Sequence, residues 1–459
     1  MNLEGKHIVV VGLRVTGRAV ARFAKSRGAS VCVADSGDAG ALAEAAAEMT
    51  ALGVKTQIGP HRTEIFTGAD LIVVSPGVSE NLAPLRTAVG RGVPVIGEIE
   101  LACRFMTTPM VAVSGTNGKT TVTSLVGEML RHSGKRVFVG GNIGDPLIGY
   151  VQRGQDAEVA VVEVSSFQLD TADRFHPKVA VMLNVAEDHL DRYPDTAAYA
   201  ASKARLFRNQ EPADTAVFNA SDPAVRAMAE SCAARRLFFA GQEALLKEAA
   251  GSALVTDETL VVRMDSAVAE EISLAGFRLR GRHNRENAAA AALAALAAGA
   301  DLDGVRAALG AFVGLPHRLQ WVGAVKGVDF YDDSKATNVD AVRRALETFS
   351  SPVVLLLGGR DKSTDLSPLA GIAAGRVKRA VVMGEAAARL ASVLSPMVPV
   401  TEAASMAEAV NAAFADSRPG EAVLLSPACA SFDWYKNYAR RGEDFCRAVE
   451  AIERRESNG

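Results

Sequence analysis

One short segment of the sequence could hold the phosphates of a nucleotide. Residues 111–121 read VAVSGTNGKTT, in which an apolar, strand-like run leads into Gly118, Lys119 and Thr120. Such a site needs backbone N–H groups at a helix N-terminus, a lysine for the terminal phosphates and a hydroxyl for Mg²⁺. The common pattern has a glycine where this chain has Val113, so we expect a tighter loop that still binds phosphate.

Side chains that could hold a metal ion follow two later strand-like runs. Glu163 lies near the end of AVVEVSS, and Asp188, His189 and Asp191 lie within LNVAEDHLDRY. Ligands of open parallel sheets collect at the carboxyl ends of the strands, where a carboxylate and an imidazole can hold Mg²⁺ beside a terminal phosphate. The alternative for Glu163 is a salt bridge at the rim of the sheet. We favour the metal site.

Three blocks of alternating strands and helices must position these residues. Runs of β-branched residues alternate with alanine- and leucine-rich helical patterns along nearly the whole chain, which is typical of α/β units on largely parallel sheets. A chain of 459 residues is too long for one ordinary core. We therefore expect three α/β domains, over residues 1–97, 98–315 and 316–459.

Composition excludes several classes of protein. A hydrophobic content of 49% with 22% charged residues is that of a soluble globular protein, and a net charge of −3 offers nucleic acid or a membrane surface no attraction. The alanine-rich run 288–300 is too short to span a bilayer, and the N-terminus has no apolar signal core. The five cysteines are scattered. We expect a cytoplasmic protein without nucleic-acid or membrane partners.

The N-terminal segment VVGLRVTG supports a different interpretation. Gly12 and Gly17 fit the outer positions of a dinucleotide-binding fingerprint and Asp35 ends the next strand, but Arg14 replaces the middle glycine. The block is also about half the size of a full dinucleotide-binding fold. A nucleotide-binding sensor or dehydrogenase-like protein remains the alternative, although it would leave the carboxylate and imidazole of the central block without a role.

Several motifs together resemble the Mur ligases, ATP-dependent amide-forming enzymes of peptidoglycan precursor synthesis. The central motifs are GTNGKTT, EVSSFQL, NVAEDHLDRYPDTAAYAASKARLF and GRHNRENAAAA. The later runs GLPHRLQ, DDSKATN, GGRDKS and SPACASFDWYKNYARRG are similar to members that add D-glutamate to UDP-N-acetylmuramoyl-L-alanine. The alternatives are another Mur ligase or a folylpolyglutamate synthase-like ligase, but the Asp-Asn-Pro-Arg motif of members that add diaminopimelate is absent.

The resemblance implies the reaction and the domain types. ATP would phosphorylate the terminal carboxylate of the substrate, and the incoming amine would attack the acyl-phosphate to give a tetrahedral intermediate that loses phosphate. The N-terminal domain would be Rossmann-like and bind the UDP-substrate. The central domain would be a P-loop-type ATPase with a mainly parallel sheet, and the C-terminal domain would be Rossmann-like and bind the amino acid. A monomer is expected.

The resemblance also assigns residues to ATP and Mg²⁺. Composition alone would make Lys203 an exposed helix lysine, but the resemblance implies a carbamate on its amine, which becomes an oxygen ligand of the metal. Lys119, His189 and Lys203 would be catalytic. The metal ligands would be Thr120 and Glu163 for a first Mg²⁺ and His189 and Lys203 for a second. The nucleotide contacts would be Gly115, Thr116, Asn117, Gly118, Lys119, Thr120, Thr121, Asn284 and Asn287, with Arg318, Asp333 and Lys335 closing from the third domain.

The substrate contacts are implied in the same way. The loop Leu13, Val15, Thr16 and Gly17 would carry the pyrophosphate of the UDP-sugar. The uracil would lie near Asp35, Ser36, Ser75, Pro76 and Gly77, although family members often have Thr-Arg where this chain has Asp35-Ser36. Asn142 would contact the muramoyl group. D-Glutamate would be held by Thr337, Lys362, Ser431 and Tyr438.

Overall fold

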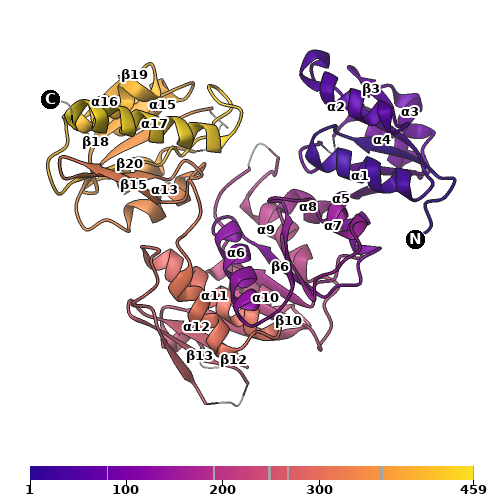
Figure 1. Cartoon of the computed structure of the whole chain (residues 1–459), viewed down its shortest axis with the longest axis horizontal. Coiled ribbons are helices and arrows are strands. Elements are labelled where there is room, and N and C mark those ends of the chain that lie inside the picture. The colour runs from indigo at the N-terminus through magenta and orange to yellow at the C-terminus, as the bar shows by residue number, and fades with distance from the viewer. Residues whose placement is uncertain (80, 190–191, 247–249, 266–267, 361–364, 458–459) are drawn as a thin grey trace. The chain divides into compact units, whose positions relative to one another are not determined.

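The computed structural model describes residues 1–459 apart from 80, 190–191, 247–249, 266–267, 361–364 and 458–459. The described chain folds into two compact units. The first consists of Met1–Val185, Tyr199–Gly276 and Asn287–Ala311, and the second of Ala186–Ala198, Phe277–Glu286 and Phe312–Gly459. Each of the three predicted α/β blocks contributes one sheet (Figure 1). The fold class is therefore confirmed, whereas the domain boundaries stay predictions.

The N-terminal block is a parallel sheet with helices on both faces, drawn in indigo in Figure 1. Its elements are β1 (His7–Val11), α1 (Val15–Ser26), β2 (Ser30–Asp35), α2 (Ala39–Ala51), β3 (Lys55–Ile58), α3 (Thr63–Thr67), β4 (Leu71–Val74), α4 (Ala83–Gly90) and β5 (Val95–Gly97). The strand order is β3-β2-β1-β4-β5, with parallel pairing throughout the described strands. The inner strands β1, β2 and β4 contain continuous apolar runs because α1 and α2 cover one face and α3 and α4 the other.

The central block is built on a larger, mainly parallel sheet. Its strands are β6 (Met110–Ser114), β7 (Val137–Gly141), β8 (Val159–Glu163), β9 (Val179–Met182), β10 (Thr215–Asn219), β11 (Arg235–Ala240), β12 (Gly251–Val255), β13 (Thr259–Arg263) and β14 (Glu270–Ser273). Its helices are α5 (Glu98–Cys103), α6 (Lys119–His132), α7 (Leu147–Gln152), α8 (Ser166–Asp170), α9 (Thr196–Ala204), η1 (Arg205–Phe207), α10 (Pro223–Glu230), η2 (Glu243–Leu246), α11 (Arg282–Ala297) and α12 (Leu302–Ala311). The strand order is β14-β13-β12-β11-β10-β9-β6-β8-β7, and β12, β13 and β14 pair antiparallel.

The alanine-rich run belongs to α11 and packs inside the protein. Residues 288–295 are fully buried, because alanine lets a helix approach its neighbours closely at little cost in side-chain entropy. In the part of the chain that the structure describes, no helix has both the length and the apolar character to cross a bilayer.

The third block repeats the layered arrangement. Its elements are β15 (Gln320–Val325), β16 (Val328–Asp332), α13 (Val339–Leu346), β17 (Val353–Gly358), α14 (Pro368–Ala373), β18 (Val377–Met383), α15 (Ala387–Leu394), β19 (Val400–Ala403), α16 (Met406–Ala415), β20 (Ala422–Leu425) and α17 (Tyr438–Ser457). The strand order is β15-β16-β20-β17-β18-β19, and only the β15–β16 pairing among the described strands is antiparallel. Helices α13, α14 and α15 cover one face, and α16 and α17 cover the other.

The loops after β1 and β6 occupy positions where open parallel sheets bind ligands. β1 lies between β2 and β4, and β6 lies between β9 and β8. In each sheet the connections that follow run to opposite sides of this strand, which opens a crevice at its carboxyl end. The loop after β1, with Gly12 and Gly17, and the loop after β6, with Gly115 and Gly118, therefore both lie at such switch points.

Candidate active site

Two glycines shape the loop between β6 and α6. Gly115 has a φ of +148° and Gly118 a φ of +88°, which residues with side chains rarely adopt. A Cβ on Gly118 would lie 2.5 Å from Oδ1 of Asn287, and a Cβ on Gly115 would lie 3.0 Å from Cβ of Leu183. The loop therefore requires glycine at both positions and turns β6 directly into the first turn of α6.

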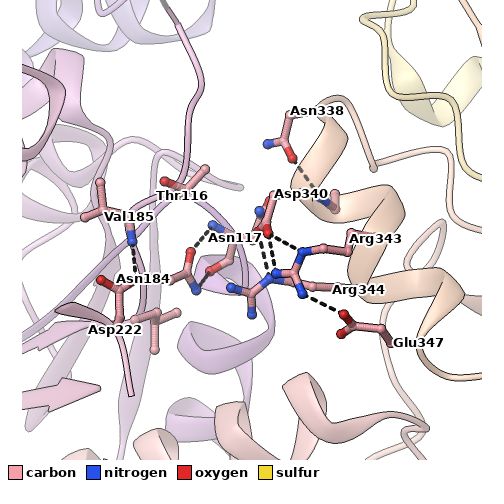
Figure 2. Close-up of polar contacts among 12 residues, drawn as sticks. Thr116, Asn117, Asn184, Val185, Asp222, Asn338, Asp340, Arg343, Arg344 and Glu347 are labelled. Atoms are coloured by element: carbon pink, nitrogen blue, oxygen red, sulfur yellow. Dashed lines mark hydrogen bonds and ion pairs between the residues drawn. The ribbon is translucent and has the colours of Figure 1, made fainter. Parts of the chain in front are cut away.

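Asn184, which was not selected from the sequence, holds the outer edge of this loop. Its carbonyl accepts the N–H of Thr116 at 2.9 Å. Its side chain accepts the N–H of Asn117 at 2.8 Å and donates to the Asn117 carbonyl at 3.0 Å (Figure 2). The next residue is also anchored, since Val185 donates its N–H to Asp222 at 2.9 Å (Figure 2). A polar residue soon after an apolar strand is the sequence signal that could have identified Asn184.

Lys119 is the first residue of α6 and turns its side chain back onto the loop. Its Nζ donates to the carbonyls of Gly115 at 2.9 Å and Thr116 at 2.8 Å. The first-turn N–H groups of a helix lack intrahelical acceptors and form the positive end of the helix dipole. The ammonium group and the helix terminus together create a cationic environment suited to phosphate oxygens.

Glu163, at the end of β8, meets the start of α6. Its Oε2 accepts the hydroxyl of Thr120 at 2.6 Å, and its Oε1 accepts Nδ2 of Asn142 at 2.9 Å. The backbone of Asn142 also donates to the Glu163 carbonyl at 2.9 Å. Only 3% of Glu163 is exposed. The structure thus brings the two predicted ligands of the first metal together, with Asn142 beside them.

This oxygen set fits Mg²⁺. A carboxylate and a hydroxyl are hard ligands, and Mg²⁺ usually takes one or two protein groups and completes its octahedron with water and substrate phosphates. Among the described residues there is no group of three or more His, Cys, Asp or Glu side chains arranged so that it could hold a metal ion by itself. Thr120 and Glu163 could therefore hold Mg²⁺ as partners of a bound phosphate.

Lys203 is a buried residue of α9 and contacts the same loop. Only 1% of its surface is exposed, so the simple reading as an exposed helix lysine is wrong. Its Nζ donates to the Gly115 carbonyl at 2.9 Å and lies 4.4 Å from the ring centre of Tyr199. The hydroxyl of Tyr199 is 3.4 Å from Oγ1 of Thr116. The Lys203 amine therefore lies against the loop of residues 115–120, which we call the phosphate loop. A carbamate on this amine remains a prediction.

His189 belongs to the second compact unit. It has a φ of +59°, and its N–H donates to Oδ1 of Asp188 at 2.9 Å. The other oxygen of Asp188 accepts Nδ2 of Asn338 at 3.1 Å and lies 3.7 Å from Nε2 of His189. Asp188 thus orients the His189 segment. Asp191 lies outside the described residues, and the role of His189 as a metal ligand stays a prediction.

The residues predicted at the adenine side lie at the start of α11. Asn287 is 7% exposed and closes over Gly118. Asn284 is equally buried and donates its Nδ2 to the carbonyl of Arg280 at 2.8 Å. Immediately before Asn284, His283 is kept neutral because burial, and then the nearby Arg344, lower its pKa to about 4. Their contacts with a nucleotide stay predictions.

Asp340, at the start of α13, anchors two arginines of the same helix. It accepts Nη2 of Arg343 at 2.5 Å and Nε of Arg344 at 2.7 Å (Figure 2). Arg343 also donates to Glu347 at 2.6 Å (Figure 2). These pairs hold the positive charge of Arg344 in place near His283.

Two neighbouring aspartates lie at the end of β16, Asp332 as its last residue and Asp333 directly after it. Asp332 accepts Nδ1 of His317 at 2.7 Å, and this hydrogen bond raises the pKa of the imidazole. Asp333 accepts the N–H of Leu319 and the hydroxyl of Ser426, both at 3.1 Å. Burial raises the pKa of Asp333 to about 7.

The other predicted residues of the third block lie on loops and at the start of α17. Lys335 places its Nζ 4.0 Å from the ring centre of Tyr438. Ser431 is buried, and its carbonyl accepts the N–H of Tyr435 at 2.9 Å. Thr337 is half-buried. Arg318 is half-buried and lowers the pKa of Asp333 against the effect of burial. Lys362 lies outside the described residues.

Arg441 organises this block but was not selected from the sequence. It is 2% exposed, and its guanidinium donates to Oγ and the carbonyl of Ser334 at 3.0 and 2.8 Å. It also donates to the carbonyls of Gly358 at 3.1 Å and Cys429 at 3.0 Å. Burial lowers its pKa to about 10, which leaves it cationic at neutral pH. Arg441 thus ties together the loops after β16, β17 and β20.

The N-terminal block contains a cleft of about 650 Å³ at the carboxyl ends of its strands. It is lined by six of the predicted substrate residues, namely Thr16, Asp35, Ser36, Ser75, Pro76 and Gly77. Asp35 braces the cleft by accepting the N–H groups of Leu13 at 2.7 Å and Gly37 at 2.8 Å. Gly17 is needed for packing, because a Cβ there would lie 1.7 Å from the Gly12 carbonyl oxygen. Val15 is exposed.

Three family models match the chain in order. The Mur ligase MurD-like N-terminal domain matches residues 6–97, the Mur ligase middle domain residues 113–295, and the Mur ligase glutamate ligase domain residues 317–429.

Known relatives match nearly the full length. The UDP-N-acetylmuramoylalanine–D-glutamate ligase of Desulfatibacillum aliphaticivorans is 51% identical over 452 residues, 98% of this chain and 100% of the relative. The protein of the same name from Desulfosudis oleivorans is 49% identical over 450 residues, 98% of this chain and 97% of the relative.

Solved structures share the fold at low sequence identity. A pseudomurein peptide ligase type C from Methanothermus fervidus has a TM-score of 0.63 and 21% identity, covering 98% of this chain and 100% of its own. The UDP-N-acetylmuramate–alanine ligase of Thermotoga maritima has a TM-score of 0.60 and 18% identity, covering 97% and 100%. The three domain models match in order, the relatives match along the full length, and the central block contains the phosphate loop. The chain therefore belongs to the Mur ligase family of ATP-dependent ligases.

Proposed function

We propose that this enzyme joins D-glutamate to UDP-N-acetylmuramoyl-L-alanine and converts ATP to ADP and phosphate. The observation that carries the proposal is the contact of the phosphate loop with Glu163, which puts an oxygen ligand for Mg²⁺ beside a cationic helix terminus. The relatives named above carry the name of this ligase, and the resemblance in the third block is to its members.

The loop and its lysine serve phosphoryl transfer. The Gly115–Thr120 loop binds the ATP phosphates through N–H groups, and Lys119 neutralises the negative charge that develops on the transferred phosphoryl group. Thr120 and Glu163 would hold Mg²⁺, which would neutralise charge on the phosphate oxygens when bound. In this step a bond forms from the substrate carboxylate to the γ-phosphorus while the bond from that phosphorus to ADP breaks.

The second step makes the amide. The neutral amine of D-glutamate attacks the acyl-phosphate carbon, loses a proton, and inorganic phosphate leaves with the electrons of the C–O bond. We propose that Lys203 carries a carbamate and, like His189, acts as a metal ligand. Burial of the Lys203 amine supports this role, because desolvation favours the neutral amine that reacts with CO₂.

We propose the substrate contacts from the family resemblance and from the cleft in the N-terminal block. The N-terminal cleft would take the UDP-sugar, with its pyrophosphate at the start of α1 and the muramoyl group toward Asn142. The nucleotide would also be contacted by Asn284, Asn287, Arg318, Asp333 and Lys335, and D-glutamate by Thr337, Lys362, Ser431 and Tyr438. We further propose that the enzyme is cytoplasmic and monomeric. Light scattering tests the oligomeric state, because a monomer has a mass of 48.1 kDa.

Phosphate release from ATP tests the function directly. The purified chain is mixed with Mg²⁺, ATP and UDP-N-acetylmuramoyl-L-alanine, and D- and L-amino acids are added one at a time. We expect rapid release with D-glutamate, poor release with L-glutamate and weakened release with D-glutamine. If L-alanine or a diamino acid were used as well as D-glutamate, the assignment of D-glutamate as the acceptor would be wrong. The enzyme would then resemble another member of the family. No release with any acceptor would overturn the proposal.

A further inference from the structure

His61 lies in the N-terminal cleft but has no role in the function proposed above. It follows β3 and lines the cleft together with Asp35 and Ser75. Its ring packs edge-on against Phe66, with ring centres 5.4 Å apart and an interplanar angle of 72°. Phe66 is fully buried, so the imidazole is held by the core of the domain.

One nitrogen of this imidazole has no hydrogen-bond partner in the part of the protein that the structure describes. Nδ1 of His61 is buried and has no hydrogen-bond partner among the described residues, and the same holds for Oγ of Ser75. Buried polar atoms without partners are rare and point to a missing ligand or water. A half-turn about χ2 exchanges Nδ1 with the carbon opposite it while keeping the ring plane on Phe66, so the ring can adopt either orientation at the cleft that it lines.

The loop that carries His61 is fixed rather than loosely attached. Nε2 of Gln57 donates to the carbonyls of Gly59 at 3.3 Å and Pro60 at 3.0 Å. The N–H of Gly59 donates to the Asp35 carbonyl at 2.9 Å, which ties the end of β3 to the end of β2. His61 is therefore presented to the cleft next to Asp35.

Charge divides the cleft into two parts. Among its described lining residues the formally charged side chains are Arg14, which precedes α1, and Asp35, at the end of β2. The start of α1 and Arg14 favour the pyrophosphate, whereas the Asp35 carboxylate repels it. The uncharged base is therefore favoured at the β2–β3 side, where His61 lies.

The groups on that side match one pyrimidine in particular. Burial lowers the pKa of His61 against the opposing effect of Asp35, which favours a neutral ring with one donor and one acceptor. Each Asp35 oxygen accepts one backbone N–H and keeps a second lone pair. Uracil offers an N–H donor flanked by carbonyl acceptors, so Asp35 can accept and His61 can donate. Cytosine has an acceptor where uracil has this donor.

We propose that His61 contacts the pyrimidine base of the nucleotide substrate and, with Asp35, selects uracil over cytosine. The inference rests on the proposed UDP-sugar substrate and adds the residue that discriminates the base.

Binding of UDP and CDP to the full chain tests this inference, with ADP present at saturation to occupy the ATP site. His61→Phe keeps a ring against Phe66 but removes both nitrogens. We expect it to weaken UDP binding about tenfold and leave CDP binding nearly unchanged, so that the preference for UDP collapses. The KM for the UDP-sugar should rise similarly, with the KM for ATP unchanged. Arg62→Ala is the matched control, because Arg62 is exposed and does not line the cleft.

Each other outcome overturns the assignment. Wild-type affinity and selectivity in His61→Phe would show that the imidazole does not contact the base. Equal weakening of UDP and CDP would make its role structural, and a fall in the unfolding temperature would accompany it. If the wild-type chain binds neither nucleotide, the UDP-substrate and the role of His61 both fail. Phosphate release with a different acylated substrate would then still support a ligase.

Discussion

Thr120 and Glu163 are 43 residues apart in the sequence and share a hydrogen bond of 2.6 Å. The hydroxyl comes from the first turn of α6 and the carboxylate from the end of β8, which is the parallel neighbour of β6. This contact places two oxygen groups that could hold a cation beside the cationic start of a helix. It is the feature of the central block that suits the transfer of a phosphoryl group.

Glu163→Gln tests the metal site. The amide keeps the size of the side chain but removes its charge, so Mg²⁺ should bind more weakly and phosphate release should fall about 100-fold or more. The Mg²⁺ concentration for half-maximal activity should rise. Glu158→Gln is the control, because Glu158 precedes the same strand and pairs on the surface with Arg136. Unchanged Mg²⁺ dependence in Glu163→Gln would remove Glu163 from the metal site.

Lys119→Ala tests the phosphate loop. Without the ammonium group the developing charge on the phosphoryl group is not neutralised, and we expect a loss of about 100-fold or more in kcat. The unfolding temperature should change little. Lys135→Ala, beyond the other end of α6, should keep full activity. Near wild-type activity in folded Lys119→Ala would contradict the assignment of this loop.

Lys203 can be tested by chemical rescue. Lys203→Ala should be nearly inactive and should recover part of its activity with acetate, whose oxygens replace those of a carbamate. Lys203→Arg is the matched variant: it keeps a positive charge but cannot form the carbamate, and it should stay inactive with acetate present. A fully active Lys203→Ala, or equal rescue of both variants, would argue against the modification.

The buried carboxyl group of Glu98 should make the stability of the folded protein depend on pH. It is 2% exposed and accepts the N–H of Ile148 at 2.7 Å, and burial raises its pKa from 4.5 to about 7. The folded state therefore binds the proton more tightly than the unfolded state. The proton on Glu98 therefore contributes roughly 3 kcal/mol to the free energy of unfolding below about pH 4.5. This contribution is lost as the pH rises through about 7.

Glu98→Gln isolates this contribution, because the amide resembles the protonated carboxyl at every pH. We expect the variant to gain stability relative to the wild type between pH 4.5 and pH 8, as measured by urea midpoints at each pH. Glu44→Gln, at an exposed position of α2, should show a constant difference. A constant difference for Glu98→Gln as well would mean that Glu98 is not protonated in the folded protein near neutral pH.

Local patterns in the sequence were enough to predict the α/β fold class and the phosphate loop. The alternation of buried strands and amphipathic helices depends on hydrogen bonding and burial within short segments. It can therefore be predicted from local sequence without knowledge of the tertiary structure. The same is true of Gly118, Lys119 and Thr120, whose chemistry depends on adjacent residues at one helix start. Glu163 could be selected because the carboxyl ends of parallel strands meet at one edge of a sheet.

Contacts between distant segments could not be predicted in this way. Asn184 supports a loop 67 residues earlier, and Arg441 joins Ser334, 107 residues earlier, to two other loops. His61 appears in the sequence as one polar residue after a short strand, and its position in the cleft depends on the order of strands in the sheet. Asparagine, arginine and histidine serve equally well as caps, surface groups or ligands. Tertiary packing decides among these roles, because it sets which groups lose water and which partners remain within hydrogen-bonding distance.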